Sequence, residues 1–68
     1  MVAARANPML EPYSLLITDD DRGYLDALRT TFEPQGYRTH LAVCGSEAIE
    51  IAQSHVVHAA IMDMEMPM

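Results

Sequence analysis

The sequence of 68 residues lacks lysine and tryptophan, and it contains a single cysteine, Cys44. One cysteine excludes an internal disulfide, and the three histidines have no cysteine companions at the spacing of a zinc site. Arginine supplies all four of the basic side chains other than histidine, and the formal net charge is −6. Nucleic acids and anionic membrane surfaces are bound through basic faces, so we expect neither as a direct partner of this segment.

Long apolar runs are also missing. No stretch approaches the ~20 apolar residues of a membrane span, and the first residues contain no hydrophobic signal core. We therefore expect a cytoplasmic protein, which a lone cysteine also fits. The chain is shorter than the ~100–150 residues of a typical domain. We expect one domain at most, either marginally stable alone or part of a longer protein.

Three short apolar stretches follow a leader without periodicity. The leader covers residues 1–13 and contains two prolines, so we expect it to be flexible. The first predicted strand covers residues 14–18 and stops at three aspartates. The second covers residues 37–43, where apolar and polar side chains alternate. The third covers residues 56–62, a nearly continuous apolar run that is typical of a strand buried on both faces.

Two helical patterns separate these strands. The first covers residues 22–33, carries one apolar stripe, and has Asp21 before it as the expected N-cap. The second covers about residues 47–54, and Ser46 is its expected N-cap. The resulting order, β-α-β-α-β, predicts an α/β fold with a parallel sheet and right-handed crossovers.

This order predicts where the acidic residues meet. If the first strand is central, the strand order is 2-1-3 and the helices cover opposite faces, as at the beginning of a flavodoxin-like fold. The carboxyl ends of the first and third strands then lie side by side. Asp19 and Asp20 follow the first strand, and Asp63 follows the third. We therefore expect these three carboxylates to share one cleft.

Such a cleft suits a particular chemistry. Carboxylates held close together repel one another unless a cation compensates their charge, and Mg²⁺ prefers oxygen ligands of this kind together with phosphate oxygens. An aspartate can also act as the nucleophile that receives a phosphoryl group. The pattern indicates a magnesium site that supports phosphoryl transfer, although the three aspartates could also form only a turn and a helix cap.

Two segments carry a resemblance to a known family. Residues 15–21 (LLITDDD) and 61–67 (IMDMEMP) resemble the two signature segments of response-regulator receiver domains, which serve two-component phosphorelays. The resemblance covers about residues 14–68. It implies that Asp63 is the phosphoacceptor for a histidine kinase or a phosphotransfer protein. It also implies that Pro67 shapes the loop after the acceptor.

The same resemblance implies a set of magnesium ligands. Asp20 and Asp63 would bind Mg²⁺ through their carboxylates, Glu65 through its backbone carbonyl, and Asp19 through a metal-bound water. The family continues beyond the position of Met68 with a Ser/Thr and a Lys that contact the phosphoryl group. We therefore expect this chain to be a fragment, an incomplete receiver domain with the first three strands and two helices.

The sequence leaves two alternatives open. The first is a truncated, non-phosphorylated interaction module that pairs, as a homo-oligomer or with another chain, through the exposed edge of its third strand. The second is a magnesium-dependent phosphohydrolase with Asp63 as nucleophile. The second is disfavoured because Glu65 is the only nearby candidate for the further acid or base that such an enzyme needs. We expect a signalling domain rather than an enzyme.

Overall fold

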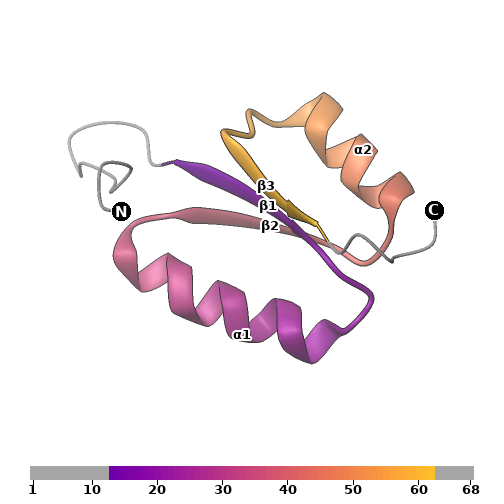
Figure 1. Cartoon of the computed structure of the whole chain (residues 1–68). Coiled ribbons are helices and arrows are strands. Elements are labelled where there is room, and N and C mark those ends of the chain that lie inside the picture. Colours follow the sequence, from indigo (N-terminus) through magenta and orange to yellow (C-terminus); the bar gives the residue numbers. More distant parts are fainter. Residues whose placement is uncertain (1–12, 63–68) are drawn as a thin grey trace.

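The computed structural model describes residues 13–62, which form a parallel sheet with one helix on each face (Figure 1). The elements in chain order are β1 (Ser14–Thr18), α1 (Arg22–Phe32), the 3-10 helix η1 (Glu33–Gln35), β2 (Arg38–Ala42), α2 (Gly45–Ser54) and β3 (Ala59–Met62). The strand order is β2-β1-β3, and β1 pairs in parallel with both neighbours, which confirms the predicted 2-1-3 sheet. Neither helix in the described part of the chain is long and apolar enough to cross a membrane.

The central strand β1 separates two small cores. All five of its residues are buried, and successive side chains point to opposite faces. Leu15 and Ile17 pack with Leu25 of α1 on one face. Leu16 packs with Ala42 and Ala48 on the other face, beneath α2. The two helices therefore cover opposite faces of the sheet, as the rule of right-handed crossovers predicts for this strand order (Figure 1).

The helix α1 begins where the sequence predicts it. Asp21 has an extended backbone, and its Oδ1 accepts a hydrogen bond from the Tyr24 N–H at 3.2 Å. This bond satisfies one of the N–H groups that the first turn of a helix leaves free. Leu25 is buried, while Leu28 and Phe32 are partly buried against the same core, so the predicted stripe is confirmed.

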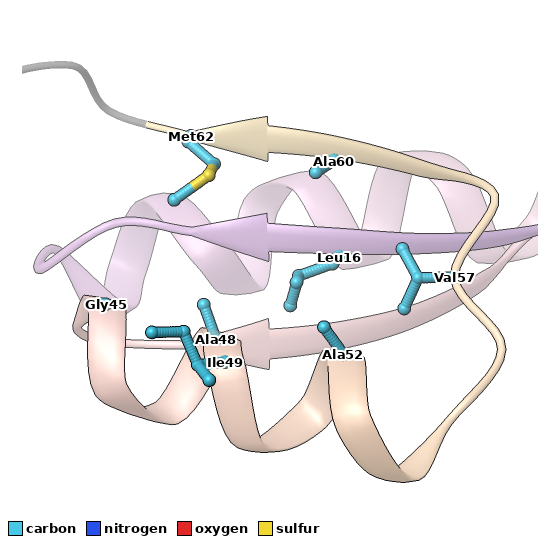
Figure 2. A pocket seen from close by; sticks show the side chains of 8 residues that line it. All are labelled: Leu16, Gly45, Ala48, Ile49, Ala52, Val57, Ala60 and Met62. Carbon is cyan, nitrogen blue, oxygen red and sulfur yellow. The ribbon is translucent and has the colours of Figure 1, made fainter.

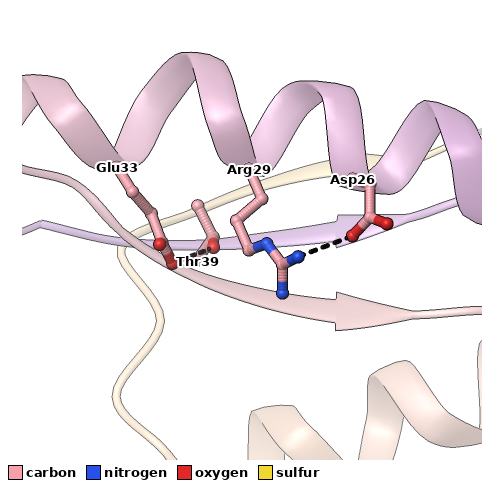
Figure 3. Close-up of polar contacts among 4 residues, drawn as sticks. All are labelled: Asp26, Arg29, Glu33 and Thr39. Carbon is pink, nitrogen blue, oxygen red and sulfur yellow. Dashed lines mark hydrogen bonds and ion pairs between the residues drawn. The ribbon is translucent and has the colours of Figure 1, made fainter.

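The end of α1 is joined to β2 by side chains. Thr39 Oγ1 donates to Glu33 Oε2 at 2.7 Å, and Arg29 forms an ion pair with Asp26 at 2.7 Å one turn earlier (Figure 3). Both members of the ion pair are exposed, so it stabilises the fold by less than about 1 kcal/mol.

After η1 the chain turns at Gly36, whose φ of 98° lies in the left-handed region that glycine adopts without a steric penalty.

The start of α2 differs from the prediction. The helix begins at Gly45, and Cys44 with its extended backbone is the N-cap, so the expectation of Ser46 as N-cap was wrong. The side chain of Cys44 makes no capping hydrogen bond. Glu47 Oε1 instead accepts a hydrogen bond from the Val43 N–H at 2.9 Å. This contact holds the residues before the helix and resembles the backward half of a capping box.

The third strand is shorter and more exposed than predicted. It begins at Ala59 rather than at residue 56, because the imidazole of His58 takes the place of a backbone partner for Ser14. All four of its residues are exposed, so the expectation of burial on both faces was wrong for the described part of the chain. The reason is that β3 is an edge strand of the three-stranded sheet.

The leader predicted over residues 1–13 lies outside the described residues except for Tyr13. The Tyr13 carbonyl accepts a hydrogen bond from the Arg38 N–H at 2.8 Å, and its ring stacks on that of His58. Tyr13 is therefore held against the beginning of the sheet.

Candidate functional site

The candidate site lies at the carboxyl edge of the sheet. In the β1–β3 pairing Thr18 is the partner of Met62, so the two strands end at the same level. Ligands of open α/β sheets bind outside this edge, where the strand order reverses. Asp19 and Asp20 directly follow β1, and in the sequence Asp63 directly follows Met62.

Three of the predicted site residues fall outside the described range. Asp63, Glu65 and Pro67 belong to residues 63–68, so their predicted roles remain predictions. Asp19, Asp20 and Asp21 are described, and the structure gives each of them a different environment.

Asp19 has a fixed backbone and one engaged carboxylate oxygen. Its N–H donates to the Ala42 carbonyl at 3.1 Å. Its Oδ1 accepts a hydrogen bond from the Asp21 N–H at 2.9 Å, which closes a turn by a side chain two residues back. Asp19 is partly exposed, so its second oxygen remains available to a ligand.

Asp20 differs from both of its neighbours. Asp21 caps α1, and Asp19 closes the turn, but the exposed carboxylate of Asp20 has no hydrogen bond or ion pair with any residue in the described range 13–62. A turn followed by a helix cap explains Asp19 and Asp21 and leaves Asp20 without a structural role. Of the three aspartates, Asp20 is therefore the one whose two carboxylate oxygens both lack a partner in the described range.

The donor set fits part of a magnesium site. Within residues 13–62 no group of three or more His, Cys, Asp or Glu side chains comes together as a complete metal site. Mg²⁺, however, commonly uses only one or two carboxylates, completed by waters and phosphate oxygens. Asp20 and the free oxygen of Asp19 are hard ligands of the required type.

An apolar groove lies between α2 and β3 (Figure 2). Its volume is about 430 Å³, and the residues that line it are Leu16, Gly45, Ala48, Ile49, Ala52, Val57, Ala60 and Met62. None of these side chains is ionisable, so the groove offers no group for phosphoryl chemistry. Four of the lining residues belong to α2, and two of these four are alanines.

Comparisons with known proteins agree with the geometry. The sequence model described as the response regulator receiver domain matches residues 15–68. Response regulator SaeR of Staphylococcus epidermidis is 38% identical over 53 residues, which are 78% of this chain and 23% of that protein. Response regulator MprA of Mycolicibacterium vanbaalenii is 36% identical over 56 residues, which are 82% of this chain and 24% of that protein.

Response regulator MprA of Mycobacterium ulcerans is 38% identical over 53 residues. No solved structure matches the chain at a significant level. The chain thus spans about a quarter of the length of these relatives. Because the family match extends from the second residue of β1 to Met68, this chain belongs to the response regulator receiver domain family.

Proposed function

We propose that this chain is the N-terminal part of a phosphoacceptor domain in which Asp63 receives a phosphoryl group from a histidine kinase or a phosphotransfer protein. Receiver domains are the signalling domains of two-component systems, and membership of the family supports that general role. For this chain we further propose which residue accepts the phosphoryl group, which residues bind Mg²⁺ and which class of protein donates the phosphoryl group.

One observation carries the proposal. The strands β1 and β3 are parallel and end together at the Thr18–Met62 pair, so residues that follow both strands emerge at one edge. At that edge Asp20 presents a carboxylate with no partner in the described part of the chain, and Asp63 is the next residue after β3. The register supports a shared cleft for these two aspartates.

The transfer itself is a nucleophilic displacement at phosphorus. A carboxylate oxygen of Asp63 would form the new O–P bond while the N–P bond of the donor phosphohistidine breaks, and the departing imidazole takes up a proton. Bound Mg²⁺ would neutralise the charge on the phosphoryl oxygens. Asp20 and Asp63 would hold it through carboxylates, Glu65 through its carbonyl oxygen, and Asp19 through a water.

The cellular location and the binding partners of this protein belong to the same proposal. We place the protein in the cytoplasm, with the kinase or phosphotransfer protein as its partner and no direct contact of this segment with nucleic acid.

Self-association through the β3 edge stays a prediction. It is supported by the exposure of Ile61 and Met62, which are 37% and 51% exposed. Sedimentation at two protein concentrations tests it.

Acid-quenched mass spectrometry tests the phosphoacceptor. The protein as its gene encodes it is incubated with acetyl phosphate and Mg²⁺, and the intact mass and peptide map are measured. We expect one phosphoryl adduct on Asp63 that requires Mg²⁺ and is absent from Asp63→Asn. An adduct that persists in Asp63→Asn, or no adduct at any Mg²⁺ concentration, contradicts the proposal.

A further inference from the structure

His58 is joined to Ser14 by two hydrogen bonds of different kinds. The His58 backbone N–H donates to the Ser14 carbonyl at 2.9 Å. The Ser14 backbone N–H donates in return to Nδ1 of the His58 imidazole at 2.8 Å. The ring is also stacked on Tyr13, with ring centroids 5.0 Å apart and planes inclined by 29°. One side chain therefore fastens the beginning of β3 to the beginning of β1.

The imidazole replaces a backbone group. In a parallel ladder the N–H and C=O of one residue both pair with the same neighbouring strand. β3 begins only at Ala59, which pairs with Leu15, so no β3 carbonyl is placed to accept the Ser14 N–H. The His58 Nδ1 supplies the missing acceptor. Without the imidazole, the Ser14 backbone N–H at the beginning of β1 would have no partner among the described residues.

This acceptor exists in only one protonation state. A neutral imidazole that accepts at Nδ1 carries its proton on Nε2, whereas the protonated ring has N–H donors at both positions and no acceptor. Protonation would thus place two donors, Nδ1–H and the Ser14 N–H, against each other. Histidine is the side chain that ordinarily changes its charge between about pH 5 and 8.

We propose that His58 is a pH-dependent clamp, whose imidazole strengthens the join between the start of β3 and β1 only while the ring is neutral. The pairing of the two strands then loosens at the Ser14 end as the pH falls. This inference concerns the fold and does not need phosphorylation. Since β3 leads to Asp63, the clamp would also make the acceptor site sensitive to pH, and that extension alone rests on the proposed function.

Among residues 13–62, no acidic side chain is bonded to His58. The titratable groups on the neighbouring elements are Tyr13, on which the ring stacks, Arg38 of β2, the register partner of Ser14, and the His40–His55 pair of β2 and the end of α2. Within residues 13–62 no hydrogen bond or ion pair joins His58 to a carboxylate. Protonation therefore removes an acceptor without creating a described ion pair in its place.

Amide hydrogen exchange of Ser14, measured by NMR, tests the clamp in the unphosphorylated protein as its gene encodes it. Protection factors, which correct for the intrinsic pH dependence of exchange, are compared at about pH 8 and about pH 5. We expect the Ser14 protection factor to fall about tenfold at the lower pH, the factor that one hydrogen bond of typical net strength provides.

Three variants separate the clamp from general packing. His58→Phe keeps a ring for Tyr13 but has no acceptor, so Ser14 should be poorly protected at both pH values. His58→Asn places an amide oxygen near the position of Nδ1 and does not titrate, so protection should be high at both. His55→Gln removes a neighbouring histidine that does not contact Ser14, and it should behave like the natural protein.

The proposal is overturned if Ser14 protection in the natural protein is independent of pH. It is also overturned if His58→Phe is as well protected as the natural protein, or if His58→Asn loses protection as the pH falls. The same pattern is expected in Asp63→Asn, which cannot be phosphorylated on that residue. A failed phosphorylation experiment therefore leaves this test intact, and a failed clamp leaves the phosphoacceptor proposal intact.

Discussion

The backbone N–H of Asp19 donates to the carbonyl oxygen of Ala42 at 3.1 Å, which extends the β1–β2 ladder one residue beyond Thr18. Ala42 has no exposed surface and belongs to the core beneath α2. The chain thus leaves the sheet from a fixed point, and Asp20 is the first residue after that point. The fixed backbone at Asp19 supports the proposed role of Asp20 as a metal ligand, because sites built on rigid elements hold their ligands more precisely than sites on loops.

Asp20→Asn is expected to weaken Mg²⁺ binding at least about tenfold, since even residues that only support a ligand commonly cost 10–100-fold. Asp21→Asn is the matched control. It removes the same charge from the adjacent position, but asparagine is as good an N-cap as aspartate, so the helix and the Mg²⁺ affinity should be retained. Isothermal titration with MgCl₂ measures both. If both variants lose the same Mg²⁺ affinity, Asp20 contributes only its negative charge and is not a specific ligand.

The central part of the fold could be predicted because each signal was local. The strand Ser14–Thr18 has the predicted bounds, since its apolar run is ended by aspartates that also begin α1. Leu25 and its stripe indicated one buried helix face. The strand order 2-1-3 followed only from placing the first strand at the centre, as in a flavodoxin-like fold, and the rule of right-handed crossovers then put the helices on opposite faces.

The differences arise where a side chain replaces a backbone partner. His58 shortens β3 by bonding to Ser14, a residue 44 positions away, and no local pattern carries that information. Glu47 accepts from Val43 and so allows α2 to begin before Ser46. At the site, the sequence indicated Asp21 as a cap, but only the structure separates Asp19, with an engaged oxygen, from Asp20, with both oxygens free of partners in the described range.

Asp21→Ala is expected to destabilise the protein by about 1 kcal/mol, because the first turn of α1 loses the acceptor of the Tyr24 N–H. Asp21→Asn should keep nearly the full stability, since its side-chain oxygen can accept the same bond. Urea unfolding followed by circular dichroism gives both free energies of unfolding. If Asp21→Asn loses as much stability as Asp21→Ala, the charge matters and the capping bond does not.

Thr18→Val is expected to leave stability unchanged or to raise it by up to about 1 kcal/mol. The Thr18 hydroxyl is buried and has no hydrogen-bond partner within residues 13–62, and the residue is only 1% exposed. Valine has nearly the same shape and removes a polar group that is costly to bury. Thr18→Ser keeps the hydroxyl but loses a buried methyl group, so it should be destabilising. A loss of stability in Thr18→Val would reveal a partner for the hydroxyl.

His40 should make the stability of the protein depend on pH. Its ring stacks on that of His55 with centroids 4.6 Å apart. Burial lowers the pKa of His40 below its ordinary value of 6.5, and the positive charges of His55 and Arg38 lower it further. The folded protein therefore binds this proton less readily than the unfolded chain does, and the free energy of unfolding rises with pH. The contribution is fully present above about pH 6.5 and is lost as the pH falls through the lower pKa of the folded state.

Thermal unfolding at a series of pH values checks this sign. His40→Gln should flatten the rise in melting temperature across the range in which His40 titrates. His55→Gln should flatten it less, because burial, the largest cause of the lowered pKa, remains when the neighbouring charge is removed. Because His40→Gln keeps His58, the change of slope in this variant reports on His40, while the clamp at His58 is followed through the Ser14 amide. An unchanged slope in His40→Gln would assign the pH dependence to other groups and refute the role of the His40–His55 pair.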